Sequence, residues 1–479
     1  MIKPVLSTAF WGHQPRGVHV HYCAENVSIR MLFDYVAPVV AVPQPEGFDL
    51  MTTTYSTDVP LMASLPFLLM LAAIALFPLC AEAFWSKNRN KLIVALVLSV
   101  PTAVYLLQAG MGGSVYDSLL FDYIPFIILL GALFVITGGI FVDGNTGGTP
   151  AANAVLLAIG ALLASFLGTT GAAMLLIRFL LHSTRSREFR SHTILFFIAV
   201  VANCGGMLTP LGDPPLFMMY LRGAPFTWFL RLFPVWLCVN TILLGIYYLI
   251  DSYYWRKEKK KQQGLRFTVT VQGALNFLWL FGVVMAVALI NPETMPVLQS
   301  NHYLMFAREG LIILMALFSI VFTRHITRVS NSFSWGPMVE VAFLFFGIFV
   351  TMVPCLLFLK QHAQSLGVTN PAAFYYASGA LSSFLDNTPT AVTFYSLALG
   401  VGQQATSMVA GIPEQTMAAI CCGSVLFGAM TYIGNGPNFM VKTIAEHSNV
   451  KIPHFIGYIW KFALPVLLPV YVLVQLLFI

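Results

Sequence analysis

Charged side chains are scarce in this sequence. Asp, Glu, Lys and Arg make up only 9% of the 479 residues, whereas 58% of the residues are hydrophobic and the mean hydropathy is +0.79. A soluble globular chain carries about 25% charged residues. This composition therefore excludes a soluble enzyme or binding module and indicates a chain that needs lipid as part of its solvent.

Motifs for catalysis and for nucleotide-driven transport are also missing. The sequence has no nucleotide-binding loop, no His/Glu zinc-binding helix and no nucleophile elbow. Its seven cysteines show neither a disulfide framework nor a CxxC spacing, and we expect Cys421 and Cys422 to be buried apolar side chains. We therefore expect a protein that is not an enzyme and needs no cofactor, and any transport would have to be driven by an ion gradient.

Long apolar runs are abundant instead. A hydrocarbon core of about 30 Å is crossed by about 20 helical residues. Runs of suitable length cover 61–80, 92–109, 120–141, 192–212, 228–250, 271–290, 309–325, 337–359, 415–435 and 455–478. Two more apolar stretches, 151–181 and 371–400, are interrupted by Gly, Thr, Asn or Pro. The sequence therefore predicts an all-α polytopic membrane protein with about ten transmembrane helices and two re-entrant hairpins.

The interrupted segments belong to an internal repeat. SFLGTTGAA at 165–173 resembles SFLDNTPTA at 383–391, and TPLGDPPLFM at 209–218 resembles TYIGNGPNFM at 431–440. Each half has an odd number of crossings, so we expect two inverted-topology repeats. The predicted organisation is an N-terminal extension over 1–60, a first transmembrane repeat over 61–250, a basic cytoplasmic linker over 251–270 and a second transmembrane repeat over 271–479.

Lys and Arg are distributed unevenly among the short loops. Most of them fall on one side of the predicted topology, with a cluster at 255–266. The positive-inside rule therefore predicts that the linker is cytoplasmic and that both termini face outward. This rule accounts for the basic cluster without a nucleic-acid partner. The expected partners are the lipid bilayer and a small ion or solute, with a homodimer left open, and the expected location is a bacterial inner membrane.

The breaks in the apolar segments are the candidate sites for an ion or substrate. Helices that break inside a membrane leave backbone groups that lipid cannot satisfy, so such breaks survive only around a polar cavity or a bound ion. The first candidate site combines Ser165, Thr169, Thr170, Thr209 and Asp213. The second candidate site combines Ser383, Asp386, Asn387, Thr388, Thr431, Asn435 and Asn438.

Two carboxylates are central to this interpretation. A charge at the centre of a membrane helix costs about 2.5–3.5 kcal/mol, so Asp386 is expected to have a function, with capping of the next helix as the alternative. Asp213 precedes two prolines and could instead end a helix. Hydroxyl, amide and carbonyl oxygens around one carboxylate suit sodium, so Asp386 and Asp213 are the expected sodium ligands. The role of Glu340 stays open.

The motifs GGMLTPLGDPPL, SSFLDNTPT and GNGPN resemble the ion transporter superfamily, which includes NhaD-type sodium/proton antiporters, CitMHS-type citrate transporters and arsenite permeases. The resemblance covers about residues 60–479. The LDN-x-P sequence and the Gly-Asp turn are most similar to the NhaD-type members, which implies that these acids bind sodium and protons. The first hairpin reads GTTG, where carboxylate carriers have a Ser-Asn-Thr signature. The resemblance also implies scaffold helices and a moving domain with paired hairpins.

Two modes of secondary active transport compete as the function. Sodium/proton antiport is favoured because two acids, and no Lys or Arg, lie in the broken motifs. Sodium- or proton-coupled carriage of citrate or another carboxylate is the alternative, because the N-termini of half-helices attract anions. For antiport, Asp386 is expected to alternate between a protonated and a cation-bound form. A passive channel or a non-transporting assembly subunit fits two inverted broken sites less well.

Overall fold

The computed structural model describes residues 59–258, 268–300 and 302–479, so nearly all of the predicted extension over 1–60 lies outside the described residues. Up to residue 258 the helices are α1 (Leu65–Cys80), α2 (Glu82–Trp85), α3 (Asn88–Gln108), α4 (Gly112–Asp117), α5 (Ile124–Gly138), α6 (Pro150–Leu167), α7 (Thr169–Ser183), α8 (Ser191–Val200), α9 (Pro214–Leu221) and α10 (Phe233–Lys257). Short 3-10 or π segments are η2 (Leu61–Ser64), η3 (Ser118–Tyr123), η4 (Cys204–Met207) and η5 (Phe226–Leu232).

The second part of the chain is also helical. Its helices are α11 (Asn276–Leu289), α12 (Val297–Ser300), α13 (Phe306–Phe322), α14 (His325–Ser330), α15 (Gly336–His362), α16 (Pro371–Ser382), α17 (Asn387–Val401), α18 (Glu414–Phe427), α19 (Gly436–His447), α20 (Phe455–Tyr458) and α21 (Leu468–Phe478). Its 3-10 or π segments are η6 (His302–Met305), η7 (Ala363–Leu366), η8 (Gly428–Met430) and η9 (Ile459–Leu467). Two short strands of two residues each, β3 (Met408–Val409) and β4 (Ile412–Pro413), pair antiparallel.

Apolar helices long enough to span a membrane dominate the described residues. They are Leu61–Pro78, Asn88–Gln108, Gly112–Gly138, Pro150–Leu167, Phe226–Lys257, Tyr303–Phe322, Gly336–Leu366 and Phe455–Phe478. All but Pro150–Leu167, the first arm of the predicted first hairpin, coincide with predicted spans. Two other predicted spans form shorter apolar helices, Ser191–Met207 and Asn276–Leu289. The chain is therefore an all-α polytopic membrane protein, whereas its division into inverted repeats stays a prediction.

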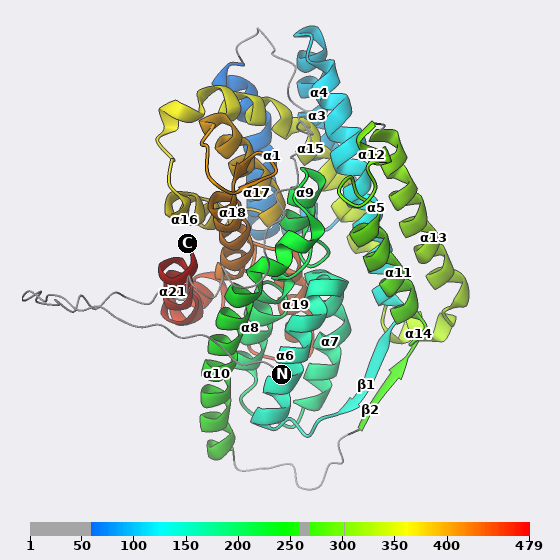
Figure 1. Cartoon of the computed structure of the whole chain (residues 1–479). Coiled ribbons are helices and arrows are strands. Elements are labelled where there is room, and N and C mark those ends of the chain that lie inside the picture. The colour runs from blue at the N-terminus through cyan, green and yellow to red at the C-terminus, as the bar shows by residue number, and fades with distance from the viewer. Residues whose placement is uncertain (1–58, 259–267, 301) are drawn as a thin grey trace, which may run out of the picture. The chain divides into compact units, whose positions relative to one another are not determined.

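The predicted linker over 251–270 is only partly a connecting segment. Its first residues continue α10 as far as Lys257, while residues 259–267 lie outside the described part of the chain. Strand β2 (Thr268–Gln272) then pairs antiparallel with β1 (Phe141–Asn145) (Figure 1). This pairing attaches the end of the linker to the segment between α5 and α6.

Both predicted hairpins are present, and they begin in the same way. Before α6, the hydroxyl of Thr149 accepts a hydrogen bond from the backbone N–H of Ala152 at 3.3 Å, and Pro150 occupies the first helical position. Before α16, the side chain of Asn370 caps the helix in the same manner, and Pro371 follows it. Polar caps followed by proline are strong helix starts. The two arms of the first hairpin, α6 and α7, lie side by side in Figure 1.

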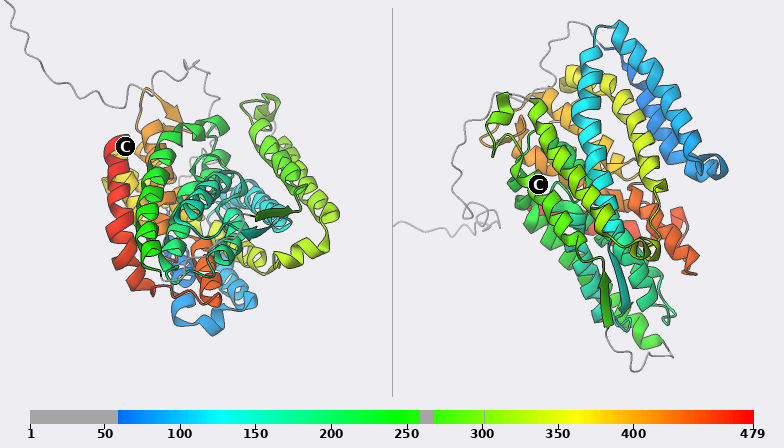
Figure 2. Two further views of the ribbon diagram at one scale, coloured as in Figure 1. Left: turned by 90° about the horizontal axis from the view of Figure 1, so that it is seen from below. Right: turned by 90° about the vertical axis from the view of Figure 1, so that its right-hand side faces the viewer.

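The two hairpins belong to a single packed core. Helix α10 packs on α6 and α8, α16 packs on α18, and α9 packs on α17 from the other half of the chain. Helices α11 and α13 contact each other and α5, as Figure 2 shows. The packing of α9 on α17 brings the two interrupted regions into one place.

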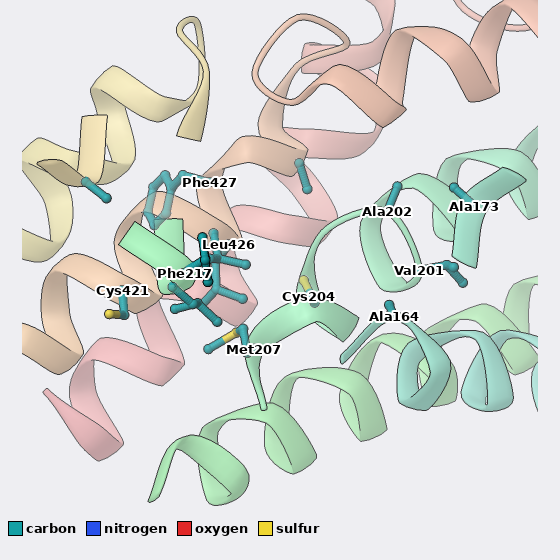
Figure 3. Close-up of a cluster of buried hydrophobic side chains, with 14 of the residues drawn as sticks. Ala164, Ala173, Val201, Ala202, Cys204, Met207, Phe217, Cys421, Leu426 and Phe427 are labelled. Carbon is teal, nitrogen blue, oxygen red and sulfur yellow. The ribbon is translucent and has the colours of Figure 1, made fainter. Parts of the chain in front are cut away.

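Apolar side chains from both halves line this shared core. Ala164 and Phe217 from the first half join Leu426 and Cys421 from α18 in one buried cluster (Figure 3). Cys421 and Cys422 are completely buried, free thiols, which confirms the expectation that they are apolar packing residues. Small residues at these positions allow the helices to approach closely, as is usual for helix interfaces in membranes.

Candidate functional site

The tip of the first hairpin packs across the break between α8 and α9. This contact between a hairpin tip and a broken helix, and its equivalent in the second half, are here called the crossings. The hydroxyl of Ser165 donates to the carbonyl oxygen of Gly205 at 2.5 Å, and Thr209 donates through its hydroxyl to the carbonyl oxygen of Ser165. The backbone N–H of Thr169, the first residue of α7, donates to the carbonyl oxygen of Gly212 at 2.8 Å. The tip therefore satisfies backbone groups that the break leaves without helical partners.

The second hairpin tip crosses the break between α18 and α19 in the same way. The hydroxyl of Thr431 donates to the carbonyl oxygen of Ser383 and accepts from the N–H of Gly434. The amide of Asn438 donates to the carbonyl oxygens of Gly428 and Thr431, at 2.8 and 3.0 Å. Thr209 and Thr431, at matched positions of the repeat, thus make equivalent bonds to the serines at matched positions of the two tips.

Glycines permit the close approach of backbone at both crossings. A Cβ atom added to Gly212 would lie 2.1 Å from the carbonyl oxygen of Gly206. A Cβ atom added to Gly434 would lie 2.7 Å from the carbonyl oxygens of both Gly428 and Ser382. Backbone atoms cannot rotate away as a side chain can, so each break requires glycine at this position.

We expect Gly212→Ala to destabilise the protein by about 2 kcal/mol, because inserting a methyl group into a packed core forces backbone shifts costing about 1–3 kcal/mol. Thermal unfolding of the purified protein in detergent would measure this. Gly245→Ala is the matched control, because a Cβ atom at Gly245 in α10 meets no atom within 4 Å. Alanine there should be neutral or stabilising. Equal unfolding temperatures for Gly212→Ala and the unmodified protein would contradict the close approach.

Asp213 lies where the two crossings meet. One oxygen of its carboxylate accepts a hydrogen bond from the hydroxyl of Thr169 at 2.9 Å. The other oxygen accepts from the side-chain amide of Asn387, at the tip of the second hairpin, also at 2.9 Å. Asn387 is oriented in turn by the hydroxyl of Ser382, which donates to its oxygen at 2.6 Å. A single carboxylate thus contacts both hairpins.

No basic side chain compensates the charge of Asp213 among the residues that the structure describes. The side chain of Asp213 is completely buried, and the hydrogen bonds described above come from neutral groups. Burying an ionised carboxylate without a cationic partner is costly, so the burial of Asp213 favours a bound proton or cation at this side chain. Protons and sodium ions are the coupling ions that the sequence predicts.

Asp386 occupies a different position. One oxygen of its carboxylate accepts from the backbone N–H of Thr388 at 3.0 Å, which makes Asp386 the N-cap of α17. The structure therefore shows the capping contact that was the alternative reading of this residue. The side chain is only partly buried, and its predicted role as an ion ligand stays a prediction.

Asn435 contacts the first half of the chain as well as its own. No hydrogen bond joins it to Asp386 among the described residues. Its amide instead donates to the carbonyl oxygen of Ala202 and to the side-chain oxygen of Asn203, both at 3.1 Å. Sequence reasoning paired the second break with its own hairpin alone, and so this contact between the halves was not expected.

Asn203 is a polar residue at the crossing that the sequence analysis missed. Its side-chain amide donates to Asn438 at 2.7 Å and to the carbonyl oxygen of Ile198 at 2.8 Å, and its oxygen accepts from Asn435. The signal was available, because Asn203 is the only amide side chain within the predicted span over 192–212. Three amides from two halves therefore form one buried network.

The remaining candidates divide into two groups. Ser165, Thr209, Ser383 and Thr431 are engaged in hydrogen bonds that hold the breaks. Thr388 is buried beside the second tip, whereas Thr170 lies in the first turn of α7 and is only partly buried. The ligand roles predicted for all these residues stay predictions.

Helix N-termini gather at the same place. Helices α7 and α17 begin at Thr169 and Asn387, the two residues that donate to Asp213, and α9 begins directly after Asp213. Helix α19 begins after Asn435, which contacts the break of the first half. The partial positive charges of these termini favour a bound anion.

An all-α membrane protein with hairpins set against broken helices has the architecture of a secondary transporter. The chain belongs to the CitMHS_2 family, described as "Putative citrate transport", whose family model matches residues 56–479. No curated protein matches the chain. The family match supports the citrate-transporter part of the superfamily resemblance, and the similarity to NhaD-type antiporters stays a prediction.

Proposed function

We propose that this protein is a secondary active transporter that carries citrate or a related carboxylate across the membrane, coupled to sodium ions or protons. The description of its family names citrate transport. The N-termini of four half-helices at the crossings supply positive partial charge for an anionic substrate. Citrate or a related carboxylate is thus favoured over the antiport that the motifs alone suggest.

The observation that carries this proposal is the buried carboxylate of Asp213, held by neutral donors from both hairpins. When a cation or proton binds there, it removes the cost of the buried charge and leaves the carboxylate bonded to Thr169 and Asn387. The helix N-termini then face the substrate without an opposing free negative charge. Substrate binding is therefore favoured after the coupling ion binds, and this order couples the two fluxes.

Sodium/proton exchange is the second candidate. The specific observation in its favour is that Asp213 lies at the break of the first half and Asp386 at the tip of the second hairpin, and none of the hydrogen bonds they make there comes from a basic side chain. In this case the proton and the cation would compete for the same carboxylates, and no carboxylate substrate would be needed.

Transport by the purified full-length protein in liposomes separates the two functions. We expect saturable uptake of labelled citrate that depends on an inward sodium or proton gradient and stops when the gradient is collapsed. Liposomes without protein are the control. Sodium-driven proton movement in the absence of citrate, together with no citrate uptake, would reject the carboxylate proposal in favour of antiport.

A further inference from the structure

A pocket of about 570 Å³ lies away from the crossings, at the C-terminal ends of α7 and α19. Its charged lining is entirely basic in the part of the chain that the structure describes. The ionisable residues that line it are Arg178, His182, Arg185, Arg190 and His447. Its volume is within the range of about 300–1,000 Å³ that is typical of small-molecule sites.

The basic groups reach this pocket from separate segments. Arg178 lies on α7 and donates to the carbonyl oxygen of Asn331, whereas Arg190 precedes α8 and donates to the carbonyl oxygen of Asn449 at 3.3 Å. Arg185, in the turn after α7, is exposed. The positive-inside rule explains why basic residues occur at this end of the protein, but it does not require them to surround one cavity.

No acidic residue lines the pocket in the part of the chain that the structure describes. Glu446 on α19 is paired with Lys442 at 2.8 Å and is not among the residues that line the cavity. The guanidinium groups have backbone carbonyls, not carboxylates, as their described partners. Such groups keep their full charge, and their fork geometry suits a planar carboxylate or a phosphate.

We propose that this pocket binds a small soluble anion that carries at least two negative charges as carboxylate or phosphate groups. The site is separate from the crossing, because Arg178 lies nine residues beyond Thr169 on α7, about 14 Å along the helix. It does not depend on which substrate the crossing carries.

An anion in the pocket would join the two halves of the chain. Helix α7 belongs to the first half and α19 to the second, and the two helices pack against each other. Both begin at the crossings and end at the pocket. A bound anion therefore holds together the far ends of two helices whose beginnings line the candidate transport site.

Binding of inorganic pyrophosphate to the full-length protein in nanodiscs of neutral phosphatidylcholine tests this proposal. We expect saturable binding whose affinity falls at least roughly tenfold in the double variant Arg185→Gln/Arg190→Gln, because each hydrogen bond to a charged group is worth about that factor or more. Arg256→Gln is the matched control, because Arg256 is an exposed arginine on α10 that does not line the pocket. The affinity of Arg256→Gln for pyrophosphate should equal that of the unmodified protein.

Three outcomes would overturn the proposal. The first is an absence of saturable binding to the unmodified protein, and the second is an equal affinity in the double variant. The third is a loss of binding when the nanodiscs contain phosphatidylglycerol, because an anionic lipid headgroup would then be the occupant. Citrate uptake is measured separately in liposomes, so a failure of the proposed transport function would not be confused with a failure of this site.

Discussion

Asp213→Asn should lower coupled transport roughly 100-fold, the equivalent of about 3 kcal/mol, because the charge is lost and the amide oxygen replaces only one of the two acceptor oxygens. The substitution keeps the size of the side chain. It removes the carboxylate that we propose binds the coupling ion and that accepts from Thr169 and Asn387. The measurement is the initial rate of gradient-driven citrate uptake in liposomes with matched amounts of inserted protein.

Asp386→Asn is the informative companion variant. Asparagine caps a helix about as well as aspartate, so α17 should keep its start while the charge is lost. We expect a smaller reduction of uptake than for Asp213→Asn, because the carboxylate of Asp386 is engaged in the cap. If Asp213→Asn transports at the unmodified rate and Asp386→Asn does not, the coupling ion binds at Asp386, as the sequence alone suggested.

Arg187→Ala should destabilise the protein by about 3–5 kcal/mol, the usual result of removing one partner from a buried ion pair. The guanidinium of Arg187 contacts Asp251 at 2.6 Å and Glu258 at 2.7 Å, and all three side chains are buried. It also donates to the carbonyl oxygen of Gly148, just before α6. Its loss would remove the basic partner of the buried Glu258 and leave the buried Asp251 in contact with His192 at 2.9 Å.

Thermal unfolding in detergent would measure this effect. Arg185→Ala is the matched control, because Arg185 is two residues away in the same turn but exposed, and the described residues include no ion-pair partner for it. The free energy of unfolding of Arg185→Ala should differ from that of the unmodified protein by no more than about 0.5 kcal/mol, the range expected for surface changes. If both variants unfold at the same temperature, the buried network contributes nothing to stability.

Much of the fold is predictable from local features of the sequence. Apolar runs give the spans, because a helix must hide its backbone from lipid, and the Thr149 and Asn370 caps followed by proline mark the two hairpins. The lengths of the individual helices are less predictable. Helix α10 continues beyond the predicted boundary because the polar residues after Ile250 include Asp251, which is buried in the network of Arg187.

The contacts within each half of the candidate site follow from the repeat, but those between the halves do not. Pairing each hairpin with the next broken segment predicts the contact between Thr169 and Asp213, which is present. The bond from Asn387 to Asp213 depends on how the halves pack, and no spacing in either half encodes it. Asn203 was missed for the same reason, because its partners Asn435 and Asn438 lie in the other half.

The bonds between the halves restrict how the protein can move. Asp213 is joined to the second hairpin through Asn387, and Asn203 is joined to the second broken helix. Any displacement that preserves these bonds moves both hairpin tips and both breaks together as one rigid body. The candidate site would then be exposed alternately to the two sides of the membrane by translation of this rigid body past the surrounding helices. Opening a gap between the two halves would instead require these buried bonds to break in every cycle.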